Sequence, residues 1–319
     1  MPRNIRINNR TASTLLVGDV IAERAYYGSS EVFVAPEDDF DPEAATYIAA
    51  VEAADEQTLE EGVKQAIDGF VTGCKADGIW GALKASCILA GARTLNGALV
   101  PLAGDAPTNF NFVSADYDRV MGLKGDGSTK YLDSNRANNA DPQDSNHNAV
   151  YVTTPITKGT GANYIGAGST DDGCNNLGRG GGSENGVFVR NRDIDTLIRK
   201  NTDQVVGFFG ASRSNPENYI RREGGLSETR PRTSRTPTTD NLFVQARYNG
   251  SGVAESLSDG RLSFYSIGES VDLATLDSRV TTLMNNITFA VNTGLNPLEY
   301  DSDTVKYINA GYEAGGTLA

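Results

Sequence analysis

The stretch RLSFYSIGESVDLATLDSRVTTL, residues 261–283, contains both of the periodicities on which the fold depends. Its first eight residues, RLSFYSIG, are rich in aromatic and branched residues, which predicts a β-strand. Ser270 or Asp272 then caps a helix, because either side chain can accept a hydrogen bond from the first helical turn. The apolar face of that helix is formed by Leu273, Leu276, Val280, Leu283 and Ile287.

Residues 96–268, which end within this stretch, consist of short β-like runs separated by turn residues. Runs such as NFNFVSA, NAVYVTTP, QVVGFFGAS and NLFVQARY alternate with clusters of Gly, Asn, Asp, Ser and Pro. Strands with this spacing predict an antiparallel sandwich. The lack of helical periodicity argues against a doubly wound parallel sheet. We therefore expect a mainly β protein with some α-helix, whose sandwich and following helix occupy residues 96–291.

Residues 38–95 are expected to form a helical connector. Asp41-Pro42-Glu43 is typical of a helix start, and Thr58-Leu59-Glu60-Glu61 has the residues of a capping box. Asp77-Gly78 is expected to end the second helix, because Gly tolerates the left-handed conformation past the last turn. The segment IWGALKASCILAG, residues 79–91, is expected to form a third, more buried helix.

Residues 1–37 are expected to form an N-terminal β arm. Gly28-Ser29-Ser30 separates two apolar pairs, which predicts a hairpin. So small a β segment cannot bury both faces of its strands. We therefore expect the arm to anchor or assemble the protein through an interface that includes Tyr26, Tyr27, Val32 and Phe33.

Residues 292–319 are expected to form a tail with a short helix, in which Tyr307 is a further interface candidate. The last part of this tail, residues 300–319, echoes residues 40–59 in its order of aromatic, acidic and alanine-rich positions. The echo is either the start of a truncated repeat or a chance similarity. In both cases the tail helix is too short to be stable alone in water, so we expect it to need a partner surface.

The composition excludes several classes of function. A net charge of −13 and a pI near 4.6 give no electrostatic support for binding nucleic acid. The three cysteines are too few and too scattered for a disulfide framework, which fits synthesis in a reducing compartment. The start MPRNIRINNR lacks the apolar core of a signal peptide, and no apolar run is long enough to cross a bilayer. We expect neither nucleic acid nor a membrane as a partner.

Four segments of the chain resemble a module of bacteriophage virion proteins. They are GIW at 78–80, GDGSTKYL at 125–132, NHNAVYVTTP at 146–155 and FYSIGESVDLATLDSRV at 264–280. The module is a concanavalin A-like (laminin G-like) jelly roll with flanking helices, and the resemblance covers roughly residues 56–290. RAYYGSSEVF, at 24–33, is also similar to short hairpins near the ends of phage tail proteins.

The resemblance implies a virion structural protein that is assembled in the cytoplasm of a bacterial host. It also implies other virion proteins as partners and a homo-oligomeric state, with a trimer favoured. We expect a tail fibre or baseplate-associated adhesin that recognises a glycan on the host surface. The alternative is a capsid decoration or cement protein that contacts only other virion proteins.

Catalytic motifs are scarce. The single histidine, His147, rules out multi-histidine zinc sites and is expected to be exposed or bonded within a turn. A pair of carboxylates would suffice for glycoside hydrolysis, but the Glu-x-x-x-Glu pattern of sandwich glycosidases does not occur in a credible strand. The sequence therefore predicts a protein that is not an enzyme, with a polysaccharide-cleaving enzyme as the lesser alternative.

One loop is a candidate calcium site, and calcium is the one cofactor considered. Its oxygen ligands would be drawn from Asp133, Asn135, Asp141, Asp144 and Asn146. The other interpretation is that these residues form Asx turns with their own backbone.

Arginines stand out against the acidic background. Six of them fall within 23 residues: Arg213, Arg221, Arg222, Arg230, Arg232 and Arg235. They either bind an anionic glycan or an acidic protein face, which would make Arg221 an interface residue, or form a solvated strand face. From their expected place in loops, the candidate glycan-binding residues are Tyr164, Arg179, Tyr219 and Arg222.

Overall fold

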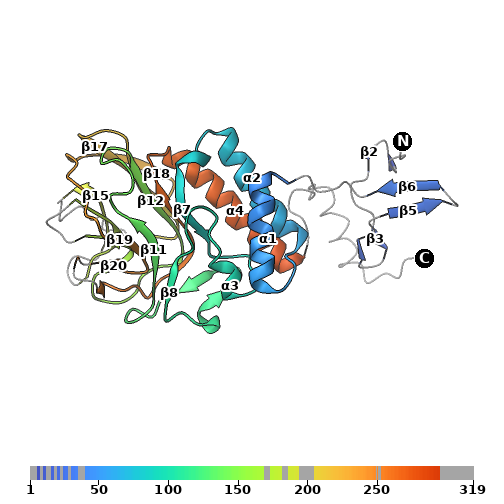
Figure 1. The fold of residues 1–319 in the computed structure, drawn as a ribbon, viewed down its shortest axis with the longest axis horizontal. Coiled ribbons are helices and arrows are strands. Elements are labelled where there is room, and N and C mark those ends of the chain that lie inside the picture. Colours follow the sequence, from blue (N-terminus) through green and yellow to red (C-terminus); the bar gives the residue numbers. More distant parts are fainter. Residues whose placement is uncertain are drawn as a thin grey trace. The chain divides into compact units, whose positions relative to one another are not determined.

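The computed structural model describes residues 40–168, 173–181, 186–193, 205–248, 250 and 253–294, and the backbone pairing of six short strands before residue 35. The chain has two compact units, Met1–Phe40 and Asp41–Ala319. Figure 1 shows the fold. Within the described residues, no helix has the length and apolar character needed to cross a membrane.

In its described residues, the second unit contains two large, mostly antiparallel sheets, each of eight strands. The first sheet has the order β18–β17–β16–β12–β22–β10–β9, with β7 also paired to β22. The strands of the first sheet, in that order and ending with β7, are Leu226–Pro231, Asn218–Glu223, Gly207–Arg213, Asn146–Thr154, Arg261–Gly268, Gly122–Lys124, Tyr117–Asp118 and Leu83–Ile88.

The second sheet has the order β15–β14–β13–β19–β11–β8, with β20 beside β13 and β21 beside β20. Its strands, in that order, are Val187–Asp193, Cys174–Arg179, Ala162–Ala167, Asn241–Val244, Tyr131–Ala137, Thr108–Phe110, Arg247–Tyr248 and Ala254–Glu255. Its one parallel contact among the described strands is between β13 and β20.

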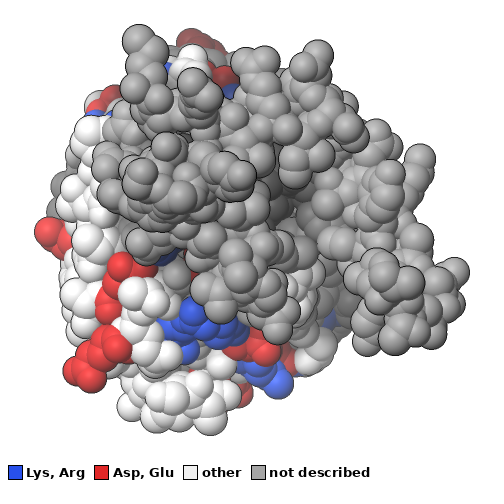
Figure 2. Space-filling model, turned by 90° about the vertical axis from the view of Figure 1, so that its right-hand side faces the viewer, with Lys and Arg blue, Asp and Glu red and all other residues white. Residues whose placement is uncertain are grey.

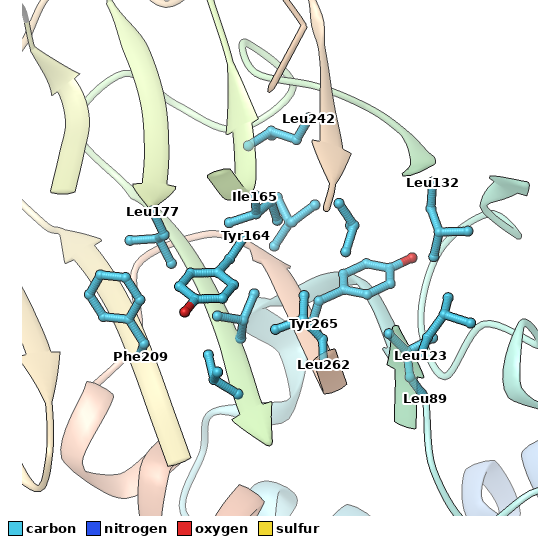
Figure 3. Packing of buried hydrophobic residues seen from close by; sticks show 14 of the residues in the cluster. Leu89, Leu123, Leu132, Tyr164, Ile165, Leu177, Phe209, Leu242, Leu262 and Tyr265 are labelled. Atoms are coloured by element: carbon cyan, nitrogen blue, oxygen red, sulfur yellow. The ribbon is translucent and has the colours of Figure 1, made fainter. Parts of the chain in front are cut away.

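The core lies between the inner faces of the two sheets (Figure 3). Leu132 and Leu177 enter it from the second sheet, and Phe209 and Tyr265 enter it from the first. Because successive side chains of a strand point to opposite faces, each of these strands also presents residues away from the core. The prediction of a mainly β protein, with an antiparallel sandwich and flanking helices, is confirmed.

Three helices gather on one side of the sandwich in Figure 1: α1 (Pro42–Asp55), α2 (Glu61–Ala76) and α4 (Leu273–Thr293). They cover the outer face of the first sheet. The ring of Phe70 on α2 meets that of Phe264 on β22 edge to face, with centroids 5.8 Å apart. Helix α4 packs on β16 and β17. In Figure 2, basic and acidic side chains lie interspersed on the described part of the visible face.

The helix boundaries agree with sequence expectations at most ends. Asp41 accepts a hydrogen bond from the Glu43 amide (3.0 Å), and Asp272 accepts one from the Thr275 amide (2.7 Å). Gly78 takes a φ of +71° just after α2, as predicted. The start of α2 differs, because its N-cap is Glu60 rather than Thr58 and no side chain caps it.

The third predicted helix, over residues 79–91, is wrong. Apart from a single 3-10 turn at Trp80–Ala82, this segment forms strand β7, Leu83–Ile88. It pairs with β22, with Cys87 opposite Tyr265. Ala85, Cys87 and Leu89 all enter the core at a spacing of two, which is the strand period. The short α3, Leu95–Ala98, follows.

The described strands of the first unit form three hairpins: β1 (Arg6–Ile7) with β2 (Arg10–Thr11), β3 (Leu16–Val17) with β4 (Val20–Ile21), and β5 (Arg24–Tyr27) with β6 (Ser30–Val34). The last is the predicted hairpin. The interface role of Tyr26, Tyr27, Val32 and Phe33 stays a prediction. The tail from residue 295 onward, with Tyr307, lies outside the described residues.

His147 is wholly buried, so the expectation of an exposed or turn-bonded histidine is wrong. It lies on β12, where its Nδ1–H donates to the Glu269 carbonyl (2.5 Å) and its Nε2 accepts from the Ser266 hydroxyl (2.8 Å). Burial penalises the charged ring and lowers the pKa of His147 to about 4.

This burial predicts a loss of stability in mild acid. The folded-state pKa of about 4 lies below the ordinary 6.5, so the unfolded chain binds the proton first. The contribution of the neutral ring is therefore fully present above pH 6.5 and is lost as the pH falls toward 4, by about 3 kcal/mol in all. Urea unfolding across this range should show the slope, and the His147→Gln variant should lack that part of it. An NMR titration midpoint of the single imidazole near 6.5 would contradict the account.

Candidate functional site

Two of the residues predicted to bind glycan lie in the core. The Tyr164 side chain is fully buried, and its hydroxyl accepts a hydrogen bond from the Ile156 amide (2.9 Å). The Tyr219 side chain is also buried, and its hydroxyl donates to the Val189 carbonyl (3.2 Å). Both residues sit within strands rather than loops and point between the sheets. They are therefore inaccessible to a glycan, and this part of the prediction is wrong.

Four of the candidate arginines make contacts within the fold. Arg222 pairs with Asp277 of α4 (2.7 Å) and ties β17 to that helix. Arg221 is buried and pairs with Glu223, and Arg179 donates to the Ile156 carbonyl (2.8 Å). Arg213 is wholly buried and donates to the backbone carbonyls of Asn191, Asn215, Pro216, Asn218 and Arg232. Arg213, Arg221 and Arg222 thus support the fold instead of forming an open basic patch. These contacts do not support the predicted roles of Arg221 at an interface and of Arg222 on a ligand.

The carboxylates of the candidate calcium loop have protein partners. Asp141 pairs with Arg136 through both oxygens, at 3.0 and 2.5 Å. Asp133 accepts from the Asn135 amide (2.8 Å), and Asp144 accepts from the Ser234 hydroxyl. In the described part of the chain, His, Cys, Asp and Glu side chains form no group of three or more that could hold a metal ion.

A polar pocket with a volume of about 690 Å3 opens at the start of β22, where neighbouring strands of the first sheet begin or end. It is built from four segments: the turn at Ser114–Asp116, the end of β10 with the loop after it, the end of β12 with the residues that follow it, and the start of β22 with the loop before it. Its lining combines carboxylates, hydroxyls and two cations: Ala115, Asp116, Lys124, Gly125, Asp126, Thr154, Pro155, Thr157, Asp259 and Arg261.

The loop of residues 125–130 is held by one carboxylate. Asp126 Oδ1 accepts hydrogen bonds from the amides of Ser128 (2.8 Å), Thr129 (2.8 Å) and Lys130 (3.1 Å), and Oδ2 accepts one from the Thr129 hydroxyl (2.6 Å). Burial raises the pKa of Asp126, but these hydrogen bonds outweigh it and hold that pKa well below its usual range. The group is therefore ionised at neutral pH and fixes the shape of the loop.

Two neighbouring loops, at residues 155–158 and 257–260, contact each other and the loop of residues 125–130. Asp259 accepts from the Thr157 amide (2.9 Å) and the Thr157 hydroxyl (2.5 Å). The Lys158 ammonium donates to the Gly127 carbonyl (2.8 Å) and to that of Leu257 (3.0 Å). Gly125 has no room for a side chain, because a Cβ there would lie 2.1 Å from the Ser258 carbonyl oxygen. The loops at residues 125–130, 155–158 and 257–260 thus form a single ordered rim.

The same loop leads into a row of aromatic side chains on the outer face of the second sheet. Tyr131 and Phe110 stack with centroids 4.4 Å apart and planes 5° from parallel. Phe243 lies 4.8 Å from Tyr131, and Tyr248 lies 5.2 Å from Phe243. Tyr131 precedes the core residue Leu132, so its side chain points outward. Phe110 is 37 % exposed, and Tyr131 and Tyr248 are half-buried.

Sequence reasoning missed both features. The segment GDGSTKYL, residues 125–132, was used only as a sign of resemblance, although it contains Asp126 of the rim and Tyr131 of the row. An Asp followed by Gly, Ser and Thr is the pattern of a side chain that bonds its own turn, and this could have indicated an ordered loop. The distant segments that complete the pocket leave no such signal in the sequence.

No protein-family model matches the chain, and no curated protein matches it. Among solved structures, the chain is similar to the enzymatically active domain of bacteriophage CBA120 tailspike protein 2 (13 % identity, 57 % of this chain, 30 % of that chain, TM-score 0.32). It is also similar to a Trypanosoma rangeli sialidase (11 % identity, 72 % of this chain, 40 % of that chain, TM-score 0.37).

A third similar structure is the receptor-binding domain of a botulinum neurotoxin C/D mosaic serotype (12 % identity, 63 % of this chain, 51 % of that chain, TM-score 0.39). The chain therefore spans about half or less of each of these structures. Similarities of this size concern the fold alone.

The prediction that the chain is not an enzyme is contradicted. Sialidases and an enzymatically active tailspike domain are among the solved structures similar to the chain. The absence of familiar catalytic motifs in the sequence does not exclude catalysis.

The hydrogen bonds of Asp126 predict that its substitution loosens the loop of residues 125–130. Replacing Asp126 with Ala removes the acceptor of three backbone amides, so the amides of Ser128, Thr129 and Lys130 should exchange hydrogen about tenfold faster or more. Hydrogen exchange read by NMR checks this, with the exposed Asp105→Ala as the matched control. Unchanged protection at these three amides would show that Asp126 does not order the loop.

Proposed function

We propose that the chain is a structural protein of a bacteriophage virion and that its sandwich recognises a glycan on the host surface. The virion assignment rests on the sequence resemblance of the segments at 78–80, 125–132, 146–155 and 264–280. Within the virion we place it in a tail fibre or next to the baseplate, where an adhesin meets the host. Its synthesis and assembly would take place in the bacterial cytoplasm.

Glycan recognition is supported by the chemistry of the surface. A sugar ring has an apolar C–H face and a rim of hydroxyls, so its receptor needs a flat apolar surface beside polar groups. The observation that carries the proposal is the stacked pair Phe110–Tyr131, which lies outward on a sheet face and adjoins the ordered loop of residues 125–130. That loop contributes Asp126 to a pocket that also offers Lys124 and Thr157 as hydrogen-bonding groups.

A capsid decoration protein is the second candidate, and a different surface favours it. Strand β18 lies at the end of the first sheet, and its residues are exposed except for the half-buried Arg230. Leu226 on this strand is 67 % exposed, and Ile220 on β17 is 40 % exposed. An exposed strand edge with apolar side chains is suited to contact with another protein. Copies per virion, counted by quantitative mass spectrometry, separate the candidates, because a decoration protein approaches the abundance of the capsid protein.

Binding measurements test the glycan proposal. An array of host surface glycans should identify a ligand, and titration calorimetry should then give its affinity. Phe110→Ala and Tyr131→Ala should each weaken binding about tenfold, since a lost ring contact costs about 1.4 kcal/mol. Leu226→Ala, an exposed apolar residue on the other sheet, is the control and should bind as the unaltered protein does.

Two results would count against this proposal. One is a folded protein that binds none of the host glycans. The other is an affinity that Phe110→Ala and Tyr131→Ala leave unchanged, provided that thermal unfolding shows both variants to be folded.

A further inference from the structure

The three hairpins of the first unit repeat with a constant period of ten residues. All three hairpins share two cross-strand pairs, one farther from the turn and one beside it. The pairs farther from the turn, here called outer, are Arg6 with Thr11, Leu16 with Ile21, and Tyr26 with Glu31. The inner pairs are Ile7 with Arg10, Val17 with Val20, and Tyr27 with Ser30. Each position of one hairpin is therefore matched ten residues later in the next, and two residues separate the inner pair in all three.

The sequence follows the same period. The residues between the inner pairs are Asn8-Asn9, Gly18-Asp19 and Gly28-Ser29, all of which are types that favour two-residue hairpin turns. The position just before each turn is apolar or aromatic in all three hairpins: Ile7, Val17 and Tyr27. These residue types favour strands. Period, turn chemistry and strand preference thus agree at every repeat.

These hairpins are too small to be stable by themselves. Four of the six strands have two residues, and the others have four and five. Among the described strands, each pair forms its own two-stranded sheet, so every hairpin has unpaired edges on both sides. An isolated two-stranded hairpin is at best marginally stable in water. Repeated units that cannot bury their own surface gain stability by stacking against equivalent units.

We propose that the hairpin repeat is the homo-oligomerisation surface of the protein, and that its partners are the same hairpins in other copies of this chain. A constant ten-residue step supports this choice of partner. Because every copy has the same step, a contact made by one hairpin recurs in register at the next two. A chain with another spacing would match at one hairpin only. Closed, symmetric assemblies of identical chains are the commonest arrangement of soluble oligomers.

Two deletions in the full chain test the role of the period. Removing residues 12–21 deletes one whole repeat and leaves the outer hairpins in phase. Removing residues 14–18 destroys the same hairpin but shifts the last one by half a period. Because both variants lose the middle hairpin, they differ mainly in whether the spacing between the two remaining hairpins is a whole number of ten-residue periods. Native mass spectrometry and light scattering give the number of copies, and thermal unfolding checks that the sandwich is intact in both.

The unaltered protein should have a mass that is a multiple of 33.9 kDa. The variant lacking residues 12–21 should form an oligomer with the same number of copies. The variant lacking residues 14–18 should dissociate at a concentration at least tenfold higher or be monomeric. A monomeric unaltered protein would overturn the proposal, as would two deletions that behave alike. Glycan affinity per chain, measured on the same samples, reports separately on the proposed function.

Discussion

The fold depends on how each of the two sheets buries its faces. Both sheets bury one face in the common core, through residues such as Leu132, Leu177 and Tyr265. The first sheet also buries its second face beneath the helices, with Phe70 against Phe264 and Arg222 paired to Asp277. On the second sheet, outward positions of β8, β11, β19 and β20 instead form the aromatic row. Because the core already fixes these strands, their outward side chains are available for a ligand at little cost to stability.

The binding surface that we propose follows from this arrangement. Strand β11 carries a core residue, Leu132, next to an outward ring, Tyr131, so packing of the core sets the position of the ring. The loop before it is shaped by Asp126 and braced by Lys158, which leaves few groups to be ordered when a ligand binds. Preorganisation of this kind is expected of a receptor for weakly interacting, hydrated molecules such as sugars.

Much of the fold could be predicted from local sequence, but less of the site could. Turn residues predicted where strands begin and end, and the caps at Asp41 and Asp272 predicted the starts of two helices. These signals could be recognised because each lies within a few residues of the boundary that it predicts. Strand β7 was mistaken for a helix, since a short, uniformly apolar segment fits either structure and pairing with β22 decides between them. The inward direction of Tyr164 and Tyr219 depends on tertiary packing, as does the pocket built from four segments of the chain.

The proposed binding surface requires that Phe110, Tyr131 and Tyr248 of the aromatic row are open to solvent, while Phe243 beside them and the rings between the sheets are buried. Hydroxyl-radical footprinting of the unaltered protein, read by mass spectrometry residue by residue, tests it directly. Our account predicts rapid oxidation of Phe110, with Tyr131 and Tyr248 next, and protection of Phe209 and Tyr265. Oxidation of Phe110 and Tyr131 as slow as that of Phe209 would show that this face is covered, and would contradict the account.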